Sequence, residues 1–95
     1  MDSSISISKT FVRALLKLRN EKEVENFLSD LLSVSEIKTL ELRWKIIEML
    51  NESLPYVEIS KRTGASSATI AKLNQKYKFG TGNFHTVLER LKKKV

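Results

Sequence analysis

The chain has 95 residues, of which 41% are hydrophobic and 29% are charged, a composition typical of one small globular domain. It contains no cysteine and a single histidine, which excludes disulfides, thiol nucleophiles and thiolate metal sites. The net charge is +6. No signal peptide and no apolar run of the ~18 residues needed to span a membrane is present, so we expect a cytoplasmic protein.

The first half of the chain predicts three helices after a loose arm formed by residues 1–8. Apolar residues recur at helical spacing from about Lys9 to Arg19. Asn20 is expected to cap a second helix, and Ser33 a long third helix that ends near Glu52, because each cap is followed three residues later by Glu. In the long helix Ile37, Leu40, Trp44 and Ile47 form one apolar seam, which Ile46, Met49 and Leu50 widen. They cover more than one side, which indicates burial on more than one side.

The segment after Pro55 predicts two short helices joined by a tight turn. The first is expected over about 56–63, because the proline ring disfavours helix before it and suits a helix start. Gly64 ends it in the left-handed conformation, and Ser66 caps the second, which runs to about Tyr77.

A sixth helix is predicted at the end of the chain, after Gly80 and Gly82. We expect Asn83 to cap it, with one apolar face formed by Phe84, Val87, Leu88, Leu91 and Val95. No strand-length alternation follows the first residues. The predicted fold is therefore all-α, a single domain of about six helices.

The small residues of TGASSATIA, at 63–71, fit a helix-turn-helix, in which two helices cross steeply and touch through small side chains. Ile59, Ile70 and Leu73 are the predicted anchors, with small Ser60 and Ala65 at the crossing. A small first turn on the outer face lets a recognition helix press into the DNA major groove. Residues 55–78 are therefore predicted to bind double-stranded DNA.

The charge distribution supports a polyanionic partner. Residues 1–55 hold eight Lys/Arg and nine Asp/Glu, a net charge of −1, whereas residues 56–95 hold nine Lys/Arg and two Glu, a net charge of +7. A Lys-rich surface kept for solubility is the simpler explanation of a basic protein, but it does not explain this asymmetry. The predicted DNA-binding residues are Lys61, Arg62, Ser66, Ser67, Ala68, Thr69, Ala71, Lys72, Gln75 and Lys76.

The motif GASSATIAK, at 64–72, resembles the Trp repressor superfamily pattern L-G-A-x-x-A-T-I-[TS]-R. The tail KYKFGTGNFHTVLERLKKK is similar to that of the Trp-repressor-related YerC/YecD branch, and the resemblance covers about residues 20–95. It implies an intertwined homodimer that binds operator DNA through two recognition helices. In that arrangement, helices within 9–52 serve dimerisation and 83–95 forms the C-terminal helix.

Two departures from the family pattern concern the co-repressor tryptophan. In Trp repressors, two arginines sandwich the indole, and a glycine after the second leaves room for it. Arg43 matches the first position, but Lys72 stands at the second and Leu73 fills the glycine position. Lysine lacks the planar stacking surface of arginine, and leucine occupies volume that the ligand needs. Arg43 and Lys72 remain the possible ligand-binding residues, and we expect no tryptophan co-repressor and no other cofactor.

The remaining polar residues do not form a catalytic or metal-binding set. Trp44 is expected in a core or a dimer interface, and His85 is expected to be exposed. No paired carboxylates, Ser/His/Asp set or phosphate-binding loop appears, so an enzyme is not predicted. Two hypotheses remain: a dimeric DNA-binding repressor, and a helical module that binds an acidic protein or RNA.

Overall fold

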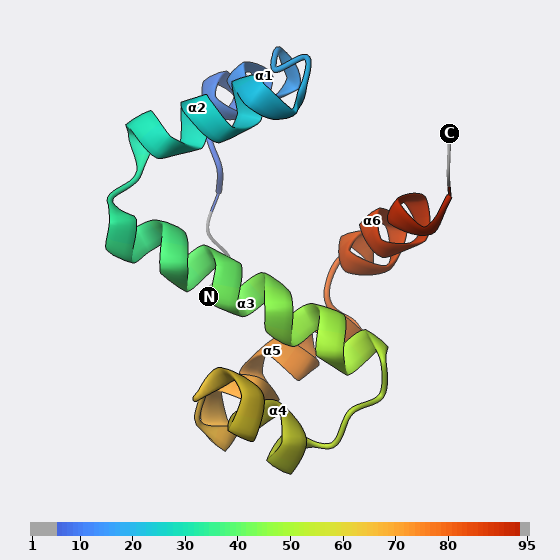
Figure 1. The fold of residues 1–95 in the computed structure, drawn as a ribbon. Helices are drawn as coiled ribbons and strands as arrows, with labels where there is room; N and C mark the ends of the chain where they lie inside the picture. Colours follow the sequence, from blue (N-terminus) through green and yellow to red (C-terminus); the bar gives the residue numbers. More distant parts are fainter. Residues whose placement is uncertain (1–5, 94–95) are drawn as a thin grey trace. The chain divides into compact units, whose positions relative to one another are not determined.

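The computed structural model describes residues 6–93, which form six α-helices and no strand. The helices are α1 (Lys9–Leu16), α2 (Glu21–Leu31), α3 (Val34–Asn51), α4 (Tyr56–Thr63), α5 (Ser67–Phe79) and α6 (Asn83–Lys92) (Figure 1). The predicted all-α fold is confirmed. Most of the predicted arm and Val95 lie outside the described residues. The chain divides into two compact units, residues 1–37 and 38–95, which we describe separately.

In the first unit, polar side chains begin the helices where the sequence predicts them. The Ser8 hydroxyl accepts a hydrogen bond within the first turn of α1, and Asn20 Oδ1 accepts one from the Glu23 amide at 2.9 Å. α1 ends at Leu16, earlier than the predicted Arg19. The Arg19 amide instead donates to the Glu23 carboxylate at 2.8 Å, so this residue belongs to the cap of α2.

Helix α3 starts with the reciprocal capping box predicted for it. The Ser33 hydroxyl accepts from the Glu36 amide at 3.2 Å, and the Glu36 carboxylate accepts from the Ser33 amide at 2.9 Å. Both bonds satisfy amides that have no partner inside the helix. The helix enters the second unit at Lys38 and ends at Asn51, one residue before the predicted end.

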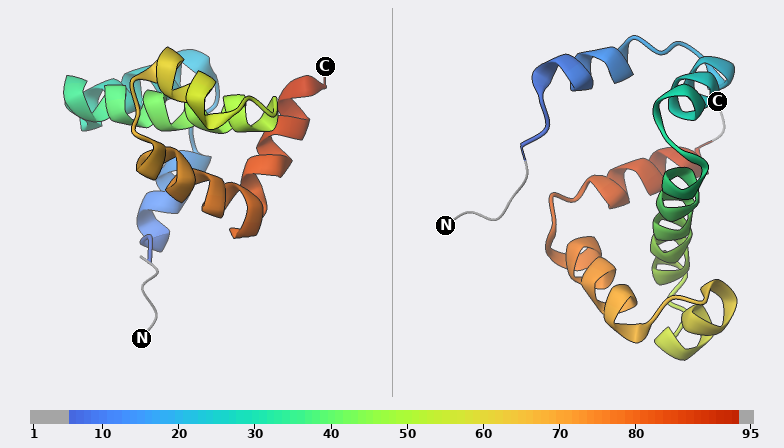
Figure 2. Two further views of the ribbon diagram at one scale, coloured as in Figure 1. Left: turned by 90° about the horizontal axis from the view of Figure 1, so that it is seen from below. Right: turned by 90° about the vertical axis from the view of Figure 1, so that its left-hand side faces the viewer.

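The second unit has one small apolar core to which α3, α4, α5 and α6 all contribute. Its buried residues are Ile46, Ile47, Ile59, Ala65, Ile70, Leu73 and Leu88. Partly buried residues packed against them include Trp44, Tyr77 and Phe84, and the Trp44 and Phe84 rings lie 6.4 Å apart. Figure 2 shows these helices from two further sides. The predicted anchors of α4 and α5 are confirmed, and the core fixes both helices on α3.

The end of α5 lies two residues beyond the predicted Tyr77, and a close backbone contact explains the position of the glycine that follows. The Gly80 amide donates to the Lys76 carbonyl at 2.9 Å. A Cβ atom at Gly80 would lie 2.4 Å from that carbonyl oxygen, which no side chain could tolerate without a shift. The backbone conformation at the end of α5 therefore favours glycine at position 80.

The start of α6 corrects one sequence prediction. Asn83 is the first residue of the helix and not its cap. Gly82 occupies the cap position at φ 91°, in the left-handed region that favours glycine. The Asn83 amide donates a hydrogen bond to the Thr81 hydroxyl at 3.3 Å. The side chain of Thr81 therefore satisfies one of the free amides at the start of α6.

Candidate nucleic-acid interface

Helices α4 and α5 form a helix-turn-helix with the turn at residues 64–66. Gly64 has φ 77°, the left-handed conformation predicted for it, and its amide donates to the Ser60 carbonyl at 2.8 Å. No atom lies within 4 Å of where its Cβ would be, so backbone conformation alone favours glycine here. The turn is thus the sharp reversal that brings α5 across α4.

Hydroxyl groups satisfy the polar backbone atoms around this turn. Ser60 Oγ donates to the Ala65 carbonyl at 2.8 Å, and Thr63 Oγ1 accepts from the Ala65 amide at 3.1 Å. Ser66 Oγ accepts from the Thr69 amide at 3.1 Å and lies 3.1 Å from its hydroxyl. Ser60, Thr63 and Ser66 therefore build the turn through their hydroxyl groups, a role that side-chain size alone did not indicate for Ser60.

The outer face of α5 is exposed to solvent along its length. Its exposed residues are Ser67, Ala68, Ala71, Lys72, Gln75 and Lys76. They are the residues predicted to face DNA, whereas Ile70 and Leu73 on the opposite face are buried. Of the other predicted contacts, Lys61, Arg62 and Ser66 are exposed, and Thr69 is half-buried. The helix therefore presents small residues at its start and basic residues further along.

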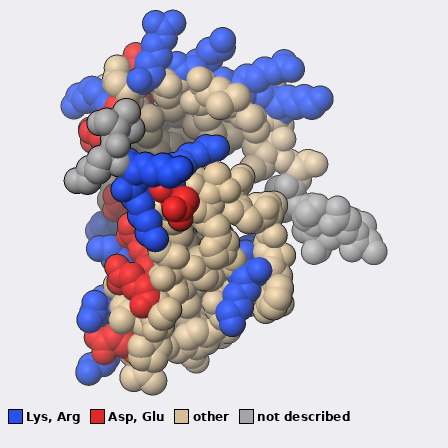
Figure 3. All heavy atoms as spheres, turned by 90° about the vertical axis from the view of Figure 1, so that its right-hand side faces the viewer, with Lys and Arg blue, Asp and Glu red and all other residues tan. Residues whose placement is uncertain are grey.

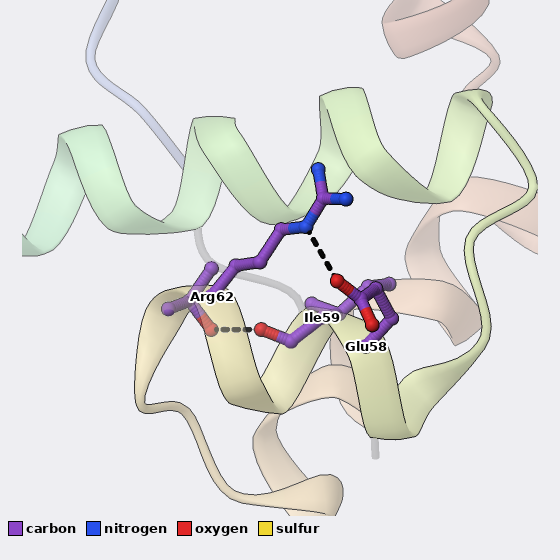
Figure 4. A network of polar contacts seen from close by, with 4 residues as sticks. Glu58, Ile59 and Arg62 are labelled. Carbon is purple, nitrogen blue, oxygen red and sulfur yellow. Dashed lines mark hydrogen bonds and ion pairs between the residues drawn. The ribbon is translucent and has the colours of Figure 1, made fainter.

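The basic side chains differ in how free they are to meet a phosphate. Figure 3 shows Lys and Arg side chains extending into solvent at several places on the surface, with Asp and Glu side chains between some of them. Arg62 Nε donates to the Glu58 carboxylate at 2.7 Å, one turn back on α4 (Figure 4). Within residues 6–93, Lys61, Lys72 and Lys76 have no ion-pair partner. Of the four basic side chains predicted to contact DNA, three are thus free of ion pairs in the described residues, and Arg62 is paired with Glu58.

A hollow of about 390 Å³ lies between the first turns of α4 and α5. Its walls are formed by Tyr56, Val57, Ser60, Lys61 and Ser67. Val57 is 75% exposed, although Ile59 in the same turn is fully buried. The sequence prediction omitted Val57, but its spacing gave a signal, since it lies off the face that carries the anchor of α4.

Three side-chain contacts that the sequence did not indicate hold α5 in place. Asn74 Nδ2 donates to the Tyr56 hydroxyl at 2.9 Å, which ties α5 to α4. The Tyr77 hydroxyl donates to Asn51 Oδ1 at 2.8 Å, which ties it to α3. His85 Nε2 lies 2.9 Å from the Tyr77 carbonyl oxygen, and the two rings are 4.4 Å apart. His85 is exposed as predicted, but it also connects α6 to α5.

The two possible ligand-binding residues lie at the surface, whereas Leu73 lies in the core. Arg43 and Lys72 are both exposed, and neither has an ion-pair partner among the residues that the structure describes. Leu73 is 5% exposed and belongs to the apolar core. The position at which Trp repressors carry glycine is therefore occupied here by a leucine that packs in the core.

Comparison with known proteins gives a consistent assignment. A family model described as Trp repressor protein matches residues 7–92. The uncharacterised protein YerC of Bacillus subtilis is 33% identical over 79 residues, which cover 83% of this chain and 76% of YerC. A TrpR-like protein of Eubacterium eligens has a TM-score of 0.81 and 34% identity over 87% of this chain and 86% of its own. A candidate Trp repressor of Staphylococcus aureus has a TM-score of 0.80 and 29% identity over 90% and 86%.

Proposed function

The chain belongs to the Trp repressor family, and from this premise we propose that it is a sequence-specific DNA-binding repressor that acts as a homodimer. The observation that carries the proposal is the exposed outer face of α5, which is small at its first turn and basic further along. Such a face suits a helix that enters the major groove. Repression would follow from occupation of an operator, which denies polymerase the same DNA.

Within this proposal, the residues of the DNA face divide into two roles. Ser67 and Ala68 lie at the first turn of α5, where small side chains let the backbone approach base edges. Lys61, Lys72 and Lys76 are exposed and unpaired in the described part of the chain, which suits contacts to phosphates. Base-edge contacts would then set the sequence, and phosphate contacts the affinity and its salt dependence.

Exposed apolar side chains support the homodimer. Those on α1, α2, the first half of α3 and α6 are Val12, Leu15, Leu16, Val24, Leu31, Val34, Leu40, Val87 and Leu91. A soluble chain seldom leaves so many large apolar residues in water, and the core of a single chain is small. A second copy of the chain would cover them. A two-fold dimer would place two α5 helices on half-sites about 34–36 Å apart, so we expect a palindromic operator.

We further propose that the repressor acts without tryptophan or any other cofactor and is not an enzyme. Leu73 fills the place where Trp repressors carry glycine, and lysine at position 72 offers no flat surface on which an indole could stack. No helix of residues 6–93 is long and apolar enough to cross a membrane. The proposed location is the cytoplasm, where operator DNA would be accessible.

Selection of duplexes from a random DNA library tests the proposal. We expect a palindromic sequence to be enriched, with the same sequence and affinity in the absence and presence of millimolar tryptophan. Binding should weaken steeply with salt, as phosphate contacts require. Equal binding to every duplex would contradict the repressor hypothesis, as would stronger binding to single-stranded RNA or an acidic protein than to any duplex. Either result would favour the hypothesis of a helical interaction module.

A further inference from the structure

Val57 is an apolar side chain exposed in the middle of a polar and basic face. It is 75% exposed on the first turn of α4, whereas the apolar residue two positions later, Ile59, is fully buried in the core. Lys61, one turn further along the same side of α4, is exposed as well. Most of the Val57 side chain is therefore open to solvent and available to contact a partner.

The hollow between α4 and α5 places Val57 beside the start of the recognition helix. Val57 and Ser67 both line this hollow of about 390 Å³, and Lys61 lies at it as well. Tyr56 forms another wall and is held by the 2.9 Å hydrogen bond from Asn74 on α5. The hollow is thus built before any partner binds, with apolar Val57, cationic Lys61 and the hydroxyl groups of Tyr56, Ser60 and Ser67 around it.

The chemistry of the major groove identifies what an apolar group can recognise there. Base edges present hydrogen-bond donors and acceptors to the groove, and the only apolar group among them is the 5-methyl of thymine. Valine forms no hydrogen bonds, so it can neither read a donor or acceptor nor bind a phosphate. Lys61, at the same hollow, can contact the adjacent phosphate and so hold the base pair in reach.

We propose that Val57 is a specificity-determining residue that contacts the 5-methyl group of one thymine in each operator half-site, next to the base pair approached by Ser67. The proposal rests on the proposed DNA-binding function and adds a residue of α4 to the reading surface of α5. Burial of one methyl group favours binding by about 0.8 kcal/mol, which corresponds to roughly a fourfold gain in affinity per half-site.

Replacement of thymine by uracil tests this contact, because it removes the methyl group and leaves the hydrogen-bonding edge unchanged. Each thymine of the selected operator is replaced in turn, and affinities are measured for the wild-type protein, Val57→Ala and Val57→Ile. We expect one thymine per half-site at which uracil weakens wild-type binding about fourfold. At that position Val57→Ile should keep the loss, and Val57→Ala should bind thymine and uracil operators equally well.

The uracil substitutions at the other thymines and the variant Ser67→Ala serve as controls. Ser67→Ala should retain the dependence on the methyl group at the position assigned to Val57, because a different side chain makes that contact. If Val57→Ala binds the operator specifically but loses affinity on uracil substitution at the same position and by the same factor as the wild type, the assignment of Val57 is wrong. Failure of the wild-type protein to select any duplex would instead overturn the proposed function.

Discussion

The carboxylate of Glu58 and the guanidinium of Arg62 form an ion pair at 2.7 Å across one turn of α4. Arg62 is 53% exposed on the side chain, so the pair lies at the surface and not in the core. Exposed pairs of this kind contribute about 0–1 kcal/mol to stability. In the proposed complex, the ion pair should have a larger effect on DNA affinity than on stability. Arg62 is already paired, and the negative charge of Glu58 repels a phosphate.

Glu58→Gln is therefore expected to strengthen binding to all duplexes. The substitution removes one negative charge from the DNA face and frees Arg62 for a phosphate, which should steepen the dependence of log affinity on log salt concentration by about 0.9. Unfolding free energy should change by less than about 1 kcal/mol. Affinities for the operator and for an unrelated duplex, measured over a range of salt concentrations, check this expectation.

Glu89→Gln is the matched control, since it removes the same charge from an exposed residue of α6. It should change the affinity much less than Glu58→Gln. An equal increase in both variants would show that net charge, and not the release of Arg62, governs the effect.

Most of the helices of this fold are predictable from local signals. The caps at Asn20, Ser33 and Ser66 lie where the sequence places them, because capping depends on residues only a few positions apart. Asn83 shows the limit of this reasoning. Asparagine is a favoured N-cap residue, so the sequence predicts Asn83 as the cap of α6. The positive φ of Gly82 places the cap at that glycine instead, one residue earlier.

The candidate site was less predictable wherever contacts join distant residues. Exposure along α5 follows from helical periodicity, and the anchors Ile59 and Ile70 follow from the same pattern. The hydrogen bond between Tyr77 and Asn51 joins residues 26 positions apart and has no local signature. The role of Val57 depends on the hollow that it shares with Ser67, which exists only after α5 has folded across α4.

Lys72→Ala and Lys61→Ala should weaken binding to operator and unrelated duplexes by the same factor. Each lysine is exposed and suited to one phosphate, so each variant should lower the salt slope by about 0.9. Substitutions at Ser67 or Ala68 should instead change which duplexes a library yields, since the first turn of α5 faces base edges in the proposed complex. A changed preference in Lys72→Ala, with only a general loss in Ser67→Ala, would reverse the assignment of the two roles.

Gly64→Ala should destabilise the protein by about 1–2 kcal/mol, because a residue with a Cβ atom is strained at φ 77°. The surrounding space is empty, so the cost arises from the backbone and not from a clash. Gly64→Asn should cost less, as asparagine tolerates the left-handed conformation better. Urea denaturation of the three proteins at one concentration measures the order, and equal stability of the alanine and asparagine variants would contradict this explanation.

The protein is expected to be an obligate dimer, with an unfolding midpoint that rises with protein concentration. Ile47→Asp should unfold it, but Ile47 is 1% exposed within one chain, so that variant tests the core. Leu40→Asp tests the dimer, because Leu40 is 49% exposed in the single chain. We expect Leu40→Asp to lose both dimerisation and folding. A folded wild-type monomer at micromolar concentration in sedimentation equilibrium would refute the obligate dimer.

Wild-type operator binding is expected to be the same with and without millimolar tryptophan. Leu73 is 5% exposed and packed in the core, so the place where Trp repressors carry glycine is filled. A ligand without a preference between two states of a protein cannot shift their populations. Because Leu73 occupies the place of the family's glycine, calorimetric titration with tryptophan should also detect no binding, and binding together with tighter operator affinity would restore a ligand-regulated repressor.

The double variant Lys72→Arg with Leu73→Gly tests the same argument in the opposite direction. It provides a planar stacking surface at residue 72 and removes the side chain that fills the core next to it. Glycine within α5 costs about 1 kcal/mol in helix propensity, and loss of a packed leucine costs roughly 2–5 kcal/mol more. Tryptophan should then raise the melting temperature of the double variant and leave that of the wild type unchanged. The single variant Leu73→Ala separates the effects, since it opens volume without a stacking partner and should gain little from the ligand.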